Sequence, residues 1–190
     1  MLRIKGEYRD IISLNGVPLE DRGWMSNTIV EDFGKFIAAL LKKEYGSPVG
    51  LEYLAVGSGT TNAENFQNRM NAFFSKVHEG SSPNAYQDDS FGWVWAKKIE
   101  ASDMSYLEDG SPTNEITNTL QISVDIEPAT PVDSGGDEQT LEFREFALIG
   151  IDGTTSNTMR MVNYVNHGVI TKDPKMTLTR EIRLKFPVEG

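Results

Sequence analysis

The 190-residue chain contains no cysteine. It can therefore hold neither a disulfide framework nor a thiol nucleophile, and it lacks the cysteine ligands of most structural zinc sites. Basic residues are also scarce, since 18 Lys and Arg stand against 28 Asp and Glu, for a formal net charge of −10. Binding of DNA or RNA needs clustered positive charge, so this balance argues against a nucleic-acid partner.

Long hydrophobic runs are missing as well. No stretch of about 18 apolar residues occurs, so we expect no membrane insertion. The first six residues lack the apolar segment of a secretory signal peptide. With 38% apolar and 24% charged residues, the composition is that of a globular protein, and we expect a single domain over residues 1–190.

Two local patterns near the N-terminus predict a hairpin and then a helix. Residues 1–24 contain Asn15-Gly16, a dipeptide that favours a tight type I′ turn. Residues 26–45 begin with good N-cap residues, and apolar residues then recur at the spacing of one helix face. The N-cap candidates are Ser26, Asn27 and Thr28.

From residue 51 onward the pattern is mostly that of β-strands. Residues 120–126 alternate apolar and polar, which predicts a half-buried strand. Residues 176–186 alternate likewise, except that Arg180 interrupts the apolar row. Its side chain is expected to be either wet, that is exposed to solvent, or paired. A loop-rich insertion is expected at 60–92, and within it the apolar residues of 66–77 have helical spacing, which leaves a short helix open as an alternative there. The expected fold class is mainly β (α+β): an antiparallel β-sandwich or barrel-like domain over 51–190, with one long N-terminal amphipathic helix packed on it.

Charge is distributed unevenly along the chain. Between residues 100 and 145 there are twelve acidic residues, and Arg144 is the single basic one. Residues 159–186 hold six basic residues and two acidic ones. Two interpretations stay open: these are two solvated faces, or an acidic face of one subunit meets a basic face of the next.

Sequence motifs for catalysis or cofactor binding are weak. Gly57-Ser58-Gly59 lacks the third glycine of a dinucleotide fingerprint and the lysine of a phosphate loop, so a tight turn that uses the φ freedom of glycine is preferred. His78 and His167 have no second ligand at i+4, and a surface position is expected for each.

The acidic pairs Asp88-Asp89 and Glu108-Asp109 lie in polar stretches, where carboxylates stay solvated and do not acquire the raised pKa of a general acid. We therefore assign no catalytic residue, no cofactor and no metal ligand, and we expect a protein that is not an enzyme. A hydrolase acting on a cell envelope is the weakest alternative, and it would need acids gathered around a groove.

Aromatic residues suggest another function. Trp93, Trp95 and Tyr86 could form the platform of a receptor- or carbohydrate-binding module. Aromatic side chains at strand positions belong more often to a core or a subunit interface, and we favour that interpretation.

Four segments in order resemble a family of small structural proteins of contractile phage tails and phage-tail-like injection systems, which share elements with tail-collar and fibre-attachment domains. The segments are Gly23-Trp-Met-Ser-Asn-Thr-Ile-Val30, Leu51-Glu-Tyr-Leu-Ala-Val-Gly-Ser-Gly59, Leu141-Glu-Phe-Arg-Glu-Phe-Ala-Leu-Ile-Gly150, and His167-Gly-Val-Ile-Thr-Lys-Asp173 with Leu178-Thr-Arg-Glu-Ile-Arg-Leu184. The resemblance spans residues 23–186. It departs from the family pattern at Ala147 (usually glycine), at Ile149 (usually phenylalanine) and most of all over 60–92.

The resemblance implies a non-enzymatic particle component that is present in several copies, made in the cytoplasm and assembled into a virion or an extracellular particle. Its partners would be further copies of itself, in a ring or trimer, and neighbouring tail, sheath, tube or baseplate subunits. The candidate interface residues are Arg144, Glu145, Arg180, Arg183, Trp93, Trp95, Phe73 and Phe74.

Overall fold

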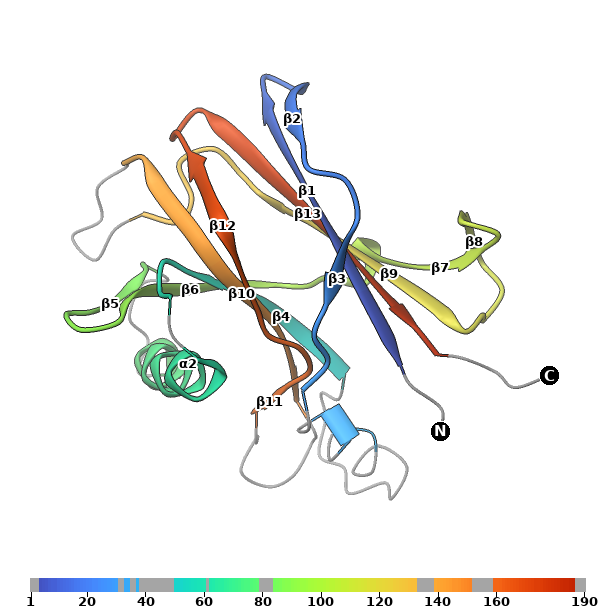
Figure 1. Ribbon diagram of the computed structural model, residues 1–190, viewed down its shortest axis with the longest axis horizontal. Coiled ribbons are helices and arrows are strands. Elements are labelled where there is room, and N and C mark those ends of the chain that lie inside the picture. The colour runs from blue at the N-terminus through green and yellow to red at the C-terminus, as the bar shows by residue number, and fades with distance from the viewer. Residues whose placement is uncertain are drawn as a thin grey trace.

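The chain forms two antiparallel sheets that face each other, with a helix against the outer side of one of them (Figure 1). The computed structural model describes residues 4–30, 33–34, 37, 50–60, 62–78, 84–132, 139–151 and 159–186.

The first sheet has the strand order β2-β1-β13-β9-β7-β8, and β3 also pairs with β1. Its strands are β1 (Lys5–Leu14), β2 (Val17–Asp21), β3 (Met25–Asn27), β7 (Met104–Glu108), β8 (Ser111–Thr113), β9 (Thr119–Ile126) and β13 (Met176–Lys185). A short 3₁₀ helix, η1 (Ala101–Asp103), leads into β7. The predicted hairpin is confirmed, since Asn15 (φ 49°) and Gly16 (φ 77°) form the turn between β1 and β2 with the positive φ angles of a type I′ turn.

The second sheet has the order β11-β10-β4-β6-β5, and β12 pairs with β10. Its strands are β4 (Gly50–Gly57), β5 (Tyr86–Asp88), β6 (Gly92–Lys98), β10 (Leu141–Ile151), β11 (Met159–Met161) and β12 (Val165–Lys172). The inner faces of both sheets supply the core, where Ile122, Val124, Ile126 and Phe146 are fully buried. The alternation predicted for 120–126 is thus confirmed.

Helix α2 (Ala63–His78) lies on the side of the second sheet that faces away from β1 and β13 (Figure 1). The Asn62 side chain caps it, because its Oδ1 accepts a hydrogen bond from the Asn65 N–H at 3.0 Å. The ring of Phe66 packs on that of Tyr164, and the ring of Phe74 on that of Tyr53, with centroids 5.5 and 4.8 Å apart. The molecule therefore has three layers: sheet, sheet and helix.

The expected fold class is wrong about the helix. Strands make up 59% of the structure and helices 14%, and no long N-terminal helix packs on the sheets in the described part of the chain. Met25–Asn27, where the helix was expected to begin, forms β3 and pairs with residues 6–8 of β1. Helical conformation occurs at Phe33, Gly34 and Ile37, while the rest of the expected helix beyond residue 30 lies outside the described residues.

A distant partner explains this error. The amide of Asn27, expected to cap a helix, accepts a hydrogen bond through its Oδ1 from Asn163 Nδ2 at 2.8 Å. The Thr28 carbonyl accepts another from the Tyr164 N–H at 3.1 Å. Asn and Ser serve equally well at caps and in side-chain contacts, so tertiary pairing outweighs the local pattern here. Helix α2 (Ala63–His78) lies within the stretch 60–92, so the helical spacing at 66–77 is confirmed and the expected loop-rich insertion is wrong over these residues.

Candidate functional site

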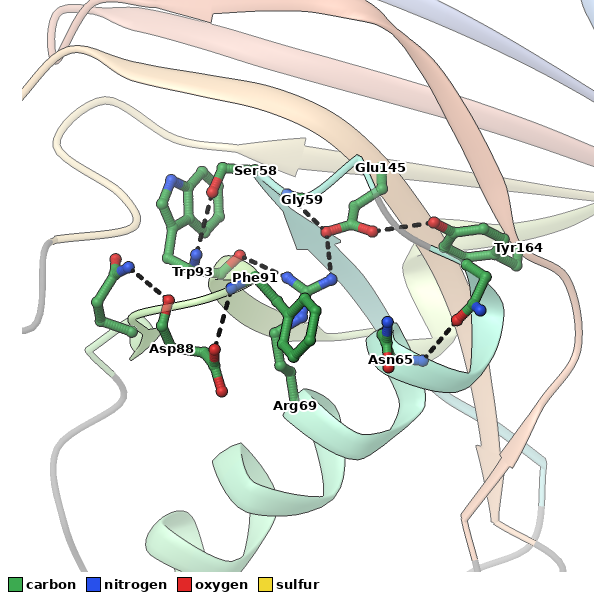
Figure 2. Close-up of polar contacts among 11 residues, drawn as sticks. Ser58, Gly59, Asn65, Arg69, Asp88, Phe91, Trp93, Glu145 and Tyr164 are labelled. Carbon is green, nitrogen blue, oxygen red and sulfur yellow. Dashed lines mark hydrogen bonds and ion pairs between the residues drawn. The ribbon is translucent and has the colours of Figure 1, made fainter.

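A cluster of polar side chains is buried between α2 and the second sheet, and it centres on Glu145 of β10 (Figure 2). The Glu145 side chain is fully buried, and that of Arg69 on α2 is 2% exposed. Glu145 Oε1 accepts hydrogen bonds from Arg69 Nη2 and from the Gly59 N–H, both at 2.7 Å. Its Oε2 accepts one from the Tyr164 hydroxyl at 3.0 Å. One cation and two neutral donors thus replace the water that the carboxylate loses.

Two glycines make room for this carboxylate. A Cβ atom at position 59 would lie 2.6 Å from Arg69 Nη2 and 2.7 Å from the Phe91 carbonyl oxygen, and one at position 57 would lie 2.8 Å from Glu145 Oε1. Neither Gly57 nor Gly59 has a left-handed backbone. The Gly57-Ser58-Gly59 segment therefore needs glycine for close approach, and the expectation that it uses φ freedom is wrong.

The adjoining β5–β6 turn is tied to the same cluster (Figure 2). Ser58 Oγ accepts a hydrogen bond from the Trp93 N–H at 3.0 Å, and Arg69 Nη1 donates to the Trp93 carbonyl at 3.4 Å. Asp88 Oδ1 accepts from the backbone N–H groups of Ser90 and Phe91 at 2.9 and 3.0 Å. The carboxylate of Asp88 therefore holds its own turn.

Electrostatics keep Tyr164 protonated in this setting. Burial and the neighbouring Glu145 carboxylate raise the pKa of its phenol to about 12. The hydroxyl thus stays a donor at any physiological pH. The buried Glu145 carboxylate is therefore held by three donors and joins α2 to the second sheet. We call this cluster the clamp.

A second buried ion pair lies inside the first sheet. Arg180 of β13 and Asp10 of β1 face each other in register, with Arg180 Nε 2.6 Å from Asp10 Oδ1 and Arg180 Nη2 3.0 Å from Oδ2. The side chains are 0% and 1% exposed. The guanidinium also lies over the ring of Phe146 at 4.0 Å from the centroid. Of the two states expected for Arg180, wet or paired, the structure has the paired one.

Most of the candidate interface residues face the interior of their own chain. Six are buried: Glu145, Arg180, Trp93, Trp95, Phe73 and Phe74. Arg144 remains partly exposed and pairs with Glu142 at 2.8 Å, and Arg183 lies 3.8 Å from the ring centroid of Trp24. An interface between subunits would therefore have to use Arg144, Arg183 or other residues of the surface.

The proposed aromatic platform is likewise not exposed. The side chains of Trp93 and Trp95 are 8% and 7% exposed. Tyr86 is half-buried, and the ammonium of Lys76 lies 4.5 Å from the centroid of its ring. This arrangement does not favour a carbohydrate-binding function.

The basic residues of segment 159–186 do not form a continuous charged face, because two of them are buried. Arg180 is buried as described, and Lys172 is 3% exposed. Lys172 Nζ donates to the carbonyls of Glu127 and Thr130 at 2.8 and 2.9 Å, and burial lowers its pKa to about 8. Lys185 Nζ pairs with Glu7 at 2.7 Å.

Sequence reasoning missed Arg69, Tyr164, Asp10 and Lys172. Two of them leave a local signal: Arg69 lies in the apolar stripe of its helix between Phe66 and Phe73, and Asp10 in the inward row of β1. A charged residue in an apolar row predicts a buried partner. Tyr164 and Lys172 give no such signal.

Three absences complete the description of the site. Across the residues that the structure describes, no group of three or more His, Asp or Glu side chains is placed to hold a metal ion. Within the same ranges, no helix is long and apolar enough to cross a membrane. Among known proteins, no family model, no curated sequence and no solved structure matches the chain.

Proposed function

We propose that the chain is a non-enzymatic structural component of a contractile phage tail or a phage-tail-like injection particle, where it acts as an oligomeric adaptor at a tail end. Its station would be the baseplate, a fibre attachment or the cap side. The proposal rests first on the four ordered segments within residues 23–186 that resemble this family.

The observation that carries the proposal is that these segments contact one another. Segment 51–59 meets segment 141–150 through the 2.7 Å hydrogen bond from Gly59 to Glu145. Segment 141–150 meets the closing strand through Phe146 and Arg180, and segment 23–30 meets it through Trp24 and Arg183. The residues behind the resemblance therefore build one shared framework, as expected if they record a common fold.

The surface offers an edge suited to assembly. Every residue of β2, the outermost strand of the first sheet, is exposed. Val17 and Leu19 on it are 62% and 55% exposed. The strand also carries Pro18, Glu20 and Asp21, residue types that protect edge strands, so only its two exposed apolar side chains favour a neighbouring subunit.

Solution mass and co-purification test the proposal. Light scattering should give a closed multiple of the 21.2 kDa chain, and the tagged protein should retain the tube or sheath proteins encoded beside it. The double variant Val17→Ser/Leu19→Ser should weaken assembly at least about tenfold. Ile116→Ser, which changes another exposed apolar residue, is the matched control and should not. A strictly monomeric protein that retains no tail protein would overturn the proposal.

A further inference from the structure

A histidine joins the two sheets. His167 belongs to β12 of the second sheet, and its Nε2 lies 3.1 Å from Nη2 of Arg180 on β13 of the first sheet. A second polar bridge lies beside it, where Arg22 Nη2 donates to the Val169 carbonyl at 3.0 Å.

The partners of the imidazole determine where its proton lies. An arginine can donate hydrogen bonds but cannot accept them, so Nε2 of His167 must be the acceptor and carries no hydrogen. Nδ1 lies 2.6 Å from the Gly168 carbonyl oxygen, which accepts from an N–H. Both contacts therefore require the neutral tautomer with its proton on Nδ1.

In the described part of the chain, no hydrogen bond joins the imidazole of His167 to a carboxylate. Asp10 of β1 uses both of its oxygens on Arg180. Tyr8 of β1 and Phe146 of β10 present rings whose centroids lie 6.3 and 6.0 Å from that of the imidazole. Arg22, which follows β2, adds a second positive charge that lowers the pKa of His167, whereas the Asp10 carboxylate raises it by more than Arg22 lowers it but by less than Arg180 does.

We propose that His167 and Arg180 form an acid-sensitive latch between the two sheets, closed while the imidazole is neutral and released when it takes up a proton. Protonation places an N–H on Nε2 directly against the N–H of the guanidinium. The hydrogen bond is then lost, and two cations face each other at 3.1 Å in a half-buried site. The proposal does not depend on the function proposed above.

The direction of the pH effect follows from linkage. Burial, followed by the charge of Arg180, lowers the pKa of His167 from 6.5 to about 4 in the closed form. An open form with a solvated imidazole binds its proton near pH 6.5, so above that pH protonation does not weaken the latch. As pH falls from 6.5 to 4, the open form gains about tenfold per pH unit, to a limit of about 300-fold.

Nuclear magnetic resonance of the intact chain tests the latch directly, because the sequence has two histidines and His78→Gln identifies the signals of His167. We expect His167 to titrate well below pH 6.5 and its ¹⁵N shifts at pH 7 to report a proton on Nδ1. A midpoint near 6.5, or a proton on Nε2, would overturn the proposal.

A variant separates titration from simple packing. In His167→Gln the side-chain amide oxygen can still accept from Arg180 but cannot titrate. The urea midpoint of the wild-type protein should therefore fall more steeply between pH 6.5 and 4.5 than that of His167→Gln, while His78→Gln should follow the wild type. Equal slopes for the wild type and His167→Gln would show that no latch operates.

Discussion

The buried pair between Arg69 and Glu145 allows a quantitative test of the clamp. Replacing Arg69 with methionine keeps an unbranched side chain of similar length on α2 and removes the cation. Glu145, fully buried, would keep the Gly59 N–H and the Tyr164 hydroxyl as donors but lose the only ion-pair partner that it has in the structure's described residues. Removing one partner of a buried pair typically costs about 3–5 kcal/mol of unfolding free energy.

The carboxylate can limit this loss by taking up a proton. A glutamate side chain in water titrates near pH 4.3, so holding it neutral at pH 7 costs about 3.7 kcal/mol, at 1.36 kcal/mol per pH unit. The expected loss for Arg69→Met is therefore about 3–4 kcal/mol at pH 7. It should shrink by up to about 2.7 kcal/mol at pH 5, because protonation is then cheaper.

Urea unfolding followed by tryptophan fluorescence measures this loss, since Trp93 and Trp95 are buried in the core. With a denaturant slope of about 2 kcal/mol/M, the midpoint should fall by about 1.5–2 M at pH 7. The matched control is Arg144→Met, which removes the exposed partner of Glu142 on the same strand as Glu145. Exposed pairs contribute about 0–1 kcal/mol, so its midpoint should change little.

A second variant tests whether the charge itself causes the loss. In Arg69→Met/Glu145→Gln the buried group is a neutral amide, which can still accept from the Gly59 N–H. We expect it to recover about 2 kcal/mol of the stability lost by Arg69→Met. Equal losses for Arg69→Met and Arg144→Met, or no recovery in the double variant, would refute the clamp.

Two further predictions concern packing and pH. Gly59→Ala should lower the unfolding free energy by about 2–3 kcal/mol, because the new Cβ would meet Arg69 and the backbone. The control Gly168→Ala, with nothing within 4 Å of its Cβ, should change it by no more than about 0.5 kcal/mol. Equal thermal midpoints for the two variants would contradict the argument that Gly59 is needed for close approach. Lys172, whose pKa is lowered from 10.5 to about 8, should make the unfolding free energy rise by up to about 1.4 kcal/mol per pH unit between pH 8 and 10, because the unfolded chain then binds more protons. Lys172→Met should lose this pH dependence. If urea titrations of the variant show the same slope, the slope does not come from Lys172.

Local patterns in the sequence predict much of the sheet architecture. The positive φ angles that Asn15-Gly16 tolerates fix a hairpin without help from the rest of the chain. Alternation over 120–126 reports a strand with one face in the core, because the side chains of a strand point to opposite faces in turn. Arg180 in an apolar row leaves two states open, exposed to water or paired, and the structure has the paired one, with Asp10 directly opposite on the neighbouring strand.

Two features could not be predicted from local patterns: the formation of β3 where the helix 26–45 was expected to begin, and the pairing of residues within the candidate site. Both depend on contacts between residues that lie far apart in the sequence. Asn27 meets Asn163 across 136 residues, and Arg69 meets Glu145 across 76. Capping residues are equally suited to such side-chain contacts, so their spacing alone cannot distinguish a helix start from β3. The burial of Trp93 and Trp95 could not be predicted for the same reason, because the residues that cover them are brought there by the packing of the two sheets.

The buried charges lie where one layer meets the next, and this placement has a consequence for assembly. Glu145 and Arg69 join the second sheet to α2, and Arg180 and His167 join the first sheet to the second. Apolar contacts between layers tolerate sliding, whereas hydrogen-bonded ions in a dry interior are satisfied in one register. A chain with its layers fixed in this way presents edges such as β2 in a constant geometry. The adaptor role proposed above would require this, because each copy in a symmetric ring must offer its neighbour the same surface at the same angle.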